Sequence, residues 1–190
     1  MKRALLLVVA AVLLAGCSVG KDAVVQGSDF TFVSPGGKTE IFYPVAQRQN
    51  LPDLSGESLQ QPGKQMHVSD FAGDIVVLNL WGQWCGPCRA EAPELSSVYD
   101  QTKSRGVRLL GLDLRDERSA ALDFVHANQI SYPSIFDPAG RVLLALNGYP
   151  RSTVPSSIVL DRQHRVAAVY LGRITATTLL AELRTLDPTV

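Results

Sequence analysis

Four segments of the chain are rich in apolar side chains, at residues 75–80, 107–114, 156–160 and 166–171, and the run at 75–80 is nearly continuous. A strand without polar alternation is typical of a sheet buried on both faces, because both rows of its side chains meet a hydrophobic layer. The last two segments are joined by a short polar turn. Parallel neighbours need a long crossover, so this pair is predicted to be antiparallel.

Segments with helical spacing alternate with these strands. The expected helices are 88–105, 119–128, a short one at 139–146 and an amphipathic closing helix at 175–186. Ser119 stands at the start of the second helix, where a hydroxyl can cap free backbone N–H groups. Residues 132–136 are expected to be extended. Strands alternating with helices and followed by a strand pair predict an α/β fold, with a central mixed sheet flanked by helices.

The segment ahead of the first long strand also has β character. Residues 30–33 and 40–43 are rich in β-branched and aromatic side chains, and residues 34–38 between them have the composition of a turn. We therefore predict an N-terminal β-hairpin in an extension that covers residues 27–50. Another short β segment is expected between residues 51 and 59.

The first 16 residues have the composition of an export signal. A basic start is followed by an apolar run at 4–15, which is too short to span a membrane comfortably. The run ends in L-A-G-C at positions 14–17, which resembles the bacterial lipobox. The resemblance implies cleavage before Cys17 and a lipid on its thiol, with residues 17–26 as a tether. A plain secretory peptide with a chance cysteine is the alternative.

Composition and charge exclude some functions. The chain has 18 basic and 18 acidic side chains, so nothing indicates a nucleic-acid partner.

Lipidation of Cys17 would leave Cys85 and Cys88 as the only thiols. Outside the cytoplasm such a pair is either oxidised or kept reduced by a dedicated electron supply.

The two cysteines form a C-x-x-C motif between a predicted buried strand and a predicted helix. A zinc site needs about four ligands, and His67, His126 and His164 are each isolated in the sequence. A structural disulfide over so short a loop would add little stability. The motif therefore indicates a redox pair and no bound metal.

The position of the pair favours reactivity. Cys85 falls at the start of the helix, where free N–H groups and the helix dipole stabilise an anion and lower the pKa of a thiol. Cys85 is therefore predicted to form the mixed disulfide with a substrate, and Cys88, nearly one turn later, to resolve it. Pro87 suits the first helical turn, because it has no N–H to leave unsatisfied.

The segment around the two cysteines resembles a known family. The run W-G-Q-W-C-G-P-C at 81–88 resembles the thioredoxin active site W-x-x-W-C-G-P-C. Pro93 matches the proline that kinks the thioredoxin active-site helix, and 153–156 stands where that family has its cis-proline loop. The resemblance covers roughly residues 51–186 and implies a thioredoxin-like domain over 51–190.

Within the superfamily, the anchor, the N-terminal extension and two residues resemble the membrane-anchored TlpA/ResA-like branch. Asn79 replaces the buried aspartate of thioredoxin, and Glu91 lies below the cysteines in that branch, where it is implicated in their proton transfer. Glu91 could instead simply favour an early helical turn. The resemblance implies that Cys85, Cys88 and Glu91 are catalytic, and that Trp84, Gly86, Pro87, Val154 and Pro155 contact substrate. Asn79 and Trp81 are expected to be structural.

These inferences predict a lipid-anchored thiol–disulfide oxidoreductase on the outer face of the cytoplasmic membrane. By resemblance it would reduce apocytochrome c cysteines with electrons from a CcdA-like membrane partner, without a cofactor beyond the Cys85–Cys88 disulfide. The alternatives are a DsbA-like oxidase of exported proteins and a non-enzymatic surface lipoprotein. A peroxiredoxin site (P-x-x-x-T-x-x-C) and the C-x-x-x-C of a copper chaperone are both missing. A monomer is the default expectation.

Overall fold

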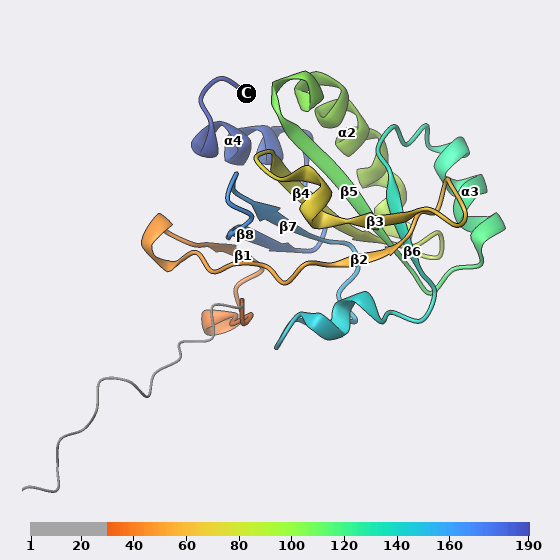
Figure 1. Ribbon diagram of the computed structural model, residues 1–190, viewed down its shortest axis with the longest axis horizontal. Coiled ribbons are helices and arrows are strands. Elements are labelled where there is room, and N and C mark those ends of the chain that lie inside the picture. Colours follow the sequence, from red (N-terminus) through yellow and green to blue (C-terminus); the bar gives the residue numbers. More distant parts are fainter. Residues whose placement is uncertain (1–29) are drawn as a thin grey trace, which may run out of the picture.

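The computed structural model describes residues 30–190, and its centre is a six-stranded mixed sheet (Figure 1). The strand order is β1-β8-β7-β4-β5-β6. The strands are β1 (Glu40–Phe42), β4 (Ile75–Trp81), β5 (Val107–Leu114), β6 (Ser134–Asp137), β7 (Ser156–Leu160) and β8 (Val166–Leu171). Strands β4, β5 and β6 are parallel, whereas β7 runs antiparallel to β4 and to β8. The predicted mixed sheet and its antiparallel pair are confirmed.

Three α-helices pack on one face of this sheet: α2 (Gly86–Thr102), α3 (Arg118–Ala127) and α4 (Ala176–Leu186). Figure 1 shows α2 and α4 together on this side, with the C-terminus beside them. Along β4, Ile75 and Val77 point into the helical layer, and Val76, Leu78 and Leu80 point into a second core on the opposite face. Both faces are buried, which explains the unbroken apolar run in the sequence.

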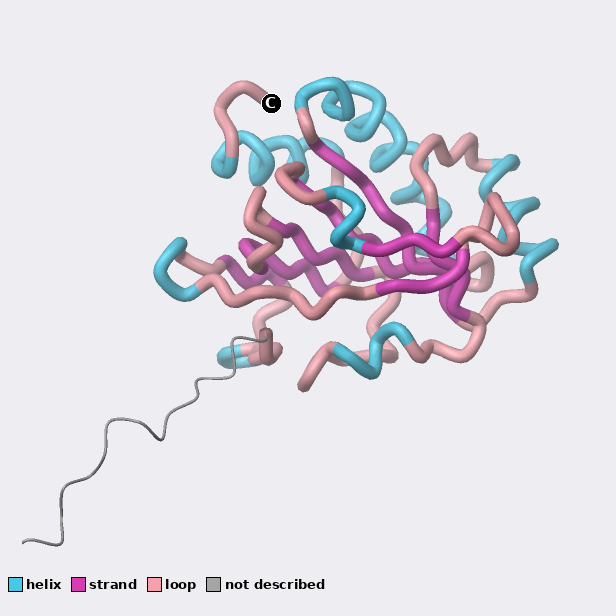
Figure 2. Tube along the Cα trace, viewed as in Figure 1, coloured by secondary structure: helices cyan, strands magenta, loops and turns pink. Residues whose placement is uncertain are grey.

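The second core is covered by the N-terminal segment and by residues around the 3-10 helix η5 (Val142–Ala145). The predicted N-terminal β-hairpin is wrong. Strand β1 pairs with β8 and forms one edge of the sheet whose strands run through the middle of Figure 2. Thr31 forms only a single parallel bridge, with Asn147. β8 would otherwise leave an open row of backbone groups at the sheet edge, and pairing with β1 satisfies them.

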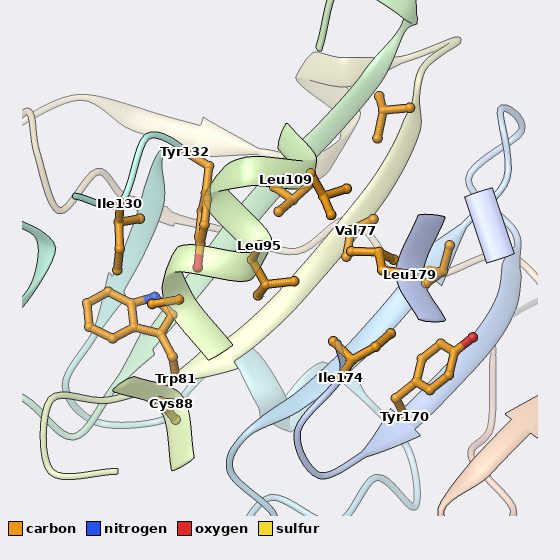
Figure 3. Close-up of a cluster of buried hydrophobic side chains, with 14 of the residues drawn as sticks. Val77, Trp81, Cys88, Leu95, Leu109, Ile130, Tyr132, Tyr170, Ile174 and Leu179 are labelled. Carbon is orange, nitrogen blue, oxygen red and sulfur yellow. The ribbon is translucent and has the colours of Figure 1, made fainter. Parts of the chain in front are cut away.

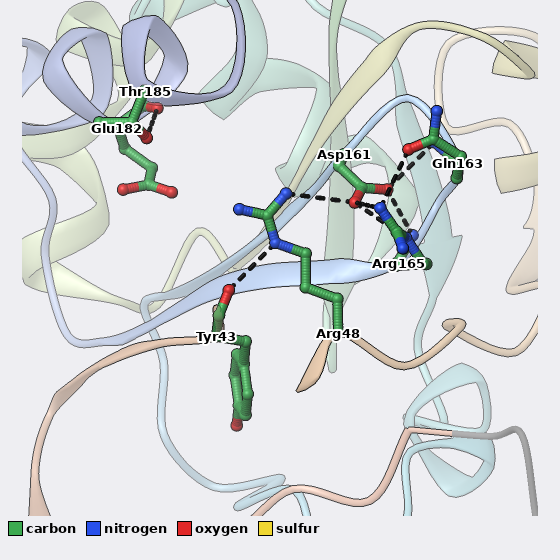
Figure 4. A network of polar contacts seen from close by, with 7 residues as sticks. All are labelled: Tyr43, Arg48, Asp161, Gln163, Arg165, Glu182 and Thr185. Carbon is green, nitrogen blue, oxygen red and sulfur yellow. Dashed lines mark hydrogen bonds and ion pairs between the residues drawn. The ribbon is translucent and has the colours of Figure 1, made fainter. Parts of the chain in front are cut away.

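An arginine holds this N-terminal segment against the sheet. Arg48 donates to the Tyr43 carbonyl at 3.0 Å and pairs with the Asp161 carboxylate at 3.2 Å (Figure 4). Asp161 also accepts from Arg165, on the other side of the β7–β8 turn. The hydrogen bonds to these partners lower the pKa of Asp161 against the opposing effect of its burial. The extension is thus part of the same packed body as the sheet.

Several element boundaries differ from those predicted. Helix α2 ends at Thr102 and continues as the 3-10 helix η4 (Lys103–Arg105). Ser119 lies inside α3 and does not cap it; Glu117 precedes the helix and makes no side-chain cap. The expected short helix at 139–146 is confined to the 3-10 turn η5.

The β segment expected between residues 51 and 59 is present as β2 (Ser55–Glu57). It pairs with β3 (Gln65–His67), which the sequence did not reveal, in a separate two-stranded ribbon. Two further 3-10 turns precede β1 and follow it, and a third follows β3: η1 (Pro35–Gly37), η2 (Val45–Gln47) and η3 (Val68–Phe71). Within residues 30–190, no helix is long and apolar enough to cross a membrane. The predicted signal peptide, lipidated Cys17 and tether lie outside the described residues.

Candidate active site

The C-x-x-C motif stands where β4 leads into α2. Cys85 and Cys88 form a disulfide, and their Cα atoms are 5.3 Å apart. Cys85 is the N-cap residue of α2, and its sulfur accepts a hydrogen bond from the Cys88 backbone N–H at 3.2 Å. The helix begins at Gly86, two residues before the predicted start, and Pro87 lies in its first turn as predicted. The sulfur of Cys85 thus lies at the positive end of the helix dipole, where a thiolate would be stabilised.

Both cysteines are buried, at 3% and 2% exposure. They belong to the hydrophobic cluster under the helices (Figure 3). Val154 is partly buried and packs against the same cluster. The peptide bond between Val154 and Pro155 is cis, as the family resemblance implied. The cis-proline loop and the start of α2 therefore border the same hydrophobic cluster, although the chain separates Gly86 from Pro155 by 69 residues.

The two tryptophans before Cys85 have different environments. Trp81 is buried, stacks on Phe124 with ring centroids 5.0 Å apart, and donates to the Ser134 hydroxyl. Its expected structural role is confirmed. Trp84 is 44% exposed, and its indole N–H donates to the Leu114 carbonyl at 2.9 Å. Trp84 thus offers an apolar ring at the surface beside Cys85, and its contact with substrate stays a prediction.

Glu91 lies in the core on the second turn of α2, only 1% exposed. Its carboxylate accepts from the Ile174 backbone N–H at 2.8 Å and from the Asn79 amide at 3.0 Å. Burial raises the pKa of Glu91 to about 7, although these two hydrogen bonds oppose the rise. Asn79 also donates to the Ser157 hydroxyl, so its expected role as a hydrogen-bonded structural residue is confirmed. A carboxyl that titrates near neutral pH is suited to proton transfer.

An acidic pair that was not expected from the sequence, Asp113 and Asp116, is joined to the loop before Cys85 through the Gln83 N–H. Asp113, at the end of β5, is fully buried, and neither of its carboxylate oxygens has a partner among the described residues. Oδ1 of Asp116 is also buried without a partner, whereas Oδ2 accepts from the Gln83 N–H at 2.6 Å. Burial and the neighbouring Asp116 raise the pKa of Asp113 well above its usual range. A proton on Asp113 can be donated to Asp116, which in turn holds the loop before Cys85.

This pair leads to a prediction about stability. The folded protein retains a proton on Asp113 that the unfolded chain releases, so stability falls as the pH rises above the ordinary aspartate pKa. An asparagine needs no proton and can still donate to Asp116. We expect Asp113→Asn to stabilise the fold by ~2 kcal/mol at pH 7.5 and to have almost no effect at pH 4.

Urea unfolding at the two pH values measures this effect. Asp123→Asn, which makes the same change on the exposed face of α3, serves as the matched control and should change stability little at either pH. A loss of stability in Asp113→Asn at pH 7.5 would contradict the shared proton.

Comparison with known proteins agrees with this geometry. A family model described as the AhpC/TSA family matches residues 48–169. The chain belongs to this family. The thiol–disulfide oxidoreductase ResA of Bacillus thuringiensis subsp. konkukian is 30% identical over 126 residues, which are 66% of this chain and 71% of that protein.

Two solved structures are more similar still. A secreted thiol–disulfide isomerase from Corynebacterium glutamicum is 45% identical, with a TM-score of 0.80 over 83% of this chain and 96% of the other. A DsbF homologue from Corynebacterium diphtheriae is 43% identical, with a TM-score of 0.78 over 83% and 99%. The thioredoxin-like fold and the TlpA/ResA-like resemblance are confirmed. The chain is a thiol–disulfide oxidoreductase, and the non-enzymatic lipoprotein alternative is wrong.

No cluster of three or more potential metal ligands occurs within residues 30–190. Of the predicted site residues, the structure brings together the cysteines, Gly86, Pro87 and Trp84 at the start of α2, with Val154 packed on the same cluster. Glu91 lies deeper, three residues beyond Cys88 on the same helix. Asp113 and Asp116 could have been noticed in the sequence as acidic residues at the end of an otherwise apolar strand.

Proposed function

We propose that this protein is an extracytoplasmic dithiol reductase that acts on disulfides of exported polypeptides, with apocytochrome c as the leading substrate. The observation that carries the proposal is the buried Glu91 below a disulfide whose first cysteine caps α2. The lipid on Cys17 would hold the domain at the outer face of the cytoplasmic membrane. A CcdA-like membrane protein would supply the electrons.

In the reducing direction the Cys85 thiolate attacks one sulfur of the substrate disulfide. A mixed disulfide forms, and the other substrate sulfur leaves as a thiolate, which takes up a proton. Cys88 then loses its proton and attacks the Cys85 sulfur, so that the second substrate thiol is released and the Cys85–Cys88 disulfide forms. Two electrons pass to the substrate, and a membrane dithiol donor restores the reduced pair.

Glu91 has the properties needed for the second step. It follows Cys88 by three residues, so both side chains project from the same face of α2. Its carboxylate is held in place by Ile174 and Asn79, and its pKa of about 7 lets it exchange a proton with Cys88 at neutral pH. We propose that it accepts the Cys88 proton, directly or through a water molecule.

The reduction potential of the Cys85–Cys88 couple tests the direction. The full-length protein in detergent is equilibrated with dithiothreitol or glutathione buffers, and the reduced fraction is measured by thiol labelling. We expect a value nearer to about −270 mV, as in thioredoxin, than to about −120 mV, as in DsbA. A DsbA-like value would overturn the reductase proposal and favour oxidation of exported thiols, which the stabilised Cys85 thiolate would also support.

A further inference from the structure

A pocket of about 360 Å³ opens beside the candidate active site. Its volume lies near the lower end of the range of small-molecule sites, so a single side chain can fit in it. Leu114, Ala139, Leu143 and Leu144 form an apolar lining, and Arg115, Arg151 and Ser152 add polar groups. Leu144 is 61% exposed, so its apolar side chain is accessible at the pocket.

The two arginines of this pocket have no acidic partner within the described part of the chain. The Arg115 guanidinium lies over the Trp84 ring, 4.7 Å from its centroid, and makes no ion pair there. Arg151 is exposed and likewise forms no ion pair with any described residue. Asp137 is the nearest acid in the sequence before Arg151, and both of its oxygens already accept backbone N–H groups at the start of η5.

The charged side chains near the pocket do not neutralise its two arginines. Asp116 is buried and bonded to the Gln83 N–H, and Glu117 is exposed but does not line the pocket. Arg118, the next cation along the chain, is already paired with Glu57. The pocket therefore presents two cations over an apolar floor, without a carboxylate of its own.

Both sides of the pocket are linked to the redox site. Arg115 stacks on Trp84, which directly precedes Cys85. Arg151 and Ser152 precede Val154, which the family resemblance implies contacts the substrate. A polypeptide lying across Cys85 and Val154 therefore passes within a few residues of the pocket.

We propose that this pocket binds an acidic side chain of the substrate polypeptide, a few residues from the disulfide that Cys85 attacks. The proposal rests on the function proposed above and adds a preference among substrates. An arginine guanidinium matches a carboxylate with two parallel hydrogen bonds. The apolar floor receives the methylene groups of glutamate or aspartate, and the charges speed the encounter.

Two matched disulfide peptides test the proposal. One carries glutamate at the positions flanking its cysteines, and the other carries glutamine there. The reduced full-length protein in detergent should react with the glutamate peptide with a kcat/KM about 10-fold higher at low salt. This ratio should fall in 0.5 M NaCl, since salt screens exposed charges.

Variants then assign the preference to the pocket. Arg151→Gln and Arg115→Gln should each lower the glutamate-to-glutamine ratio about threefold, whereas Arg151→Lys should retain part of it. Lys64→Gln removes a cation from a different pocket, near the β2–β3 turn, and should leave the ratio unchanged. Equal rates for both peptides, or an unchanged ratio in both arginine variants, would overturn the subsite and leave the reductase function standing. Failure to reduce either peptide would overturn both proposals.

Discussion

Replacing Cys85 with serine is expected to lower the rate of disulfide reduction by ~10³-fold or more, because the hydroxyl is a far weaker nucleophile at neutral pH. The remaining rate of reduction should lie below detection for both peptide and protein disulfides. Insulin reduction, followed by turbidity in the presence of dithiothreitol, provides the measurement. The fold should remain intact, since the substitution exchanges one atom at the start of α2.

The matched variant is Cys88→Ser, which separates attack from resolution. It retains the Cys85 nucleophile at the N-cap of α2, so one attack on the substrate still occurs. Without Cys88 the mixed disulfide cannot be released, and it should accumulate to one substrate per protein. Mass spectrometry without reductant detects this adduct. If Cys88→Ser formed no adduct while Cys85→Ser did, the assigned roles of the two cysteines would be reversed.

The second large effect is expected for Glu91→Gln. In the unchanged protein, the rate of resolution should rise with pH through about 7, where Glu91 loses its proton and becomes able to accept one from Cys88. Glutamine cannot accept that proton. We expect the rate of mixed-disulfide resolution above pH 7 to fall by ~10²-fold and the inflection near pH 7 to disappear. Stopped-flow measurement of tryptophan fluorescence across pH 5 to 9 follows this step.

Glu94→Gln is the control for this experiment. Glu94 lies one turn further along α2, pairs with Arg173, and accepts the Ala176 N–H, so these contacts lower its pKa. Its replacement should change the maximal rate by less than twofold and retain an inflection, moved to a lower pH because Glu94 no longer raises the pKa of Glu91. If Glu91→Gln lowered the rate equally at every pH, Glu91 would be a packing residue, and proton transfer would need another group.

Much of the fold was predictable because the sheet is buried on both faces. The apolar runs at 75–80, 107–114, 156–160 and 166–171 correspond closely to β4, β5, β7 and β8, and residues that alternate along β4 enter two separate cores. The N-terminal extension was less predictable. Local turn composition favoured a hairpin, but β1 pairs with β8, a choice that depends on which sheet edge is available in the folded molecule.

The active site, like the fold, was predictable only in part. Cys85, Gly86, Pro87 and Cys88 are adjacent in the chain, so their spacing and the helix that follows were enough to predict a redox pair at a helix start. Site residues that lie far from the C-x-x-C motif in the sequence could not be predicted from local spacing. The cis-proline loop was expected only through the family resemblance, and no sequence pattern indicated that both cysteines would be buried.

The sequence by itself therefore determined the chemistry and the fold class, because a dithiol at a helix start and long apolar strands are properties of contiguous residues. Only the tertiary structure decided how that chemistry is controlled. Burial raises the pKa of Glu91 to about 7, more than the hydrogen bonds from Ile174 and Asn79 lower it. Burial, together with the neighbouring Asp116, also raises the pKa of Asp113. The pocket between Arg115 and Arg151 likewise exists because packing brings two distant loops together, with Arg115 over Trp84.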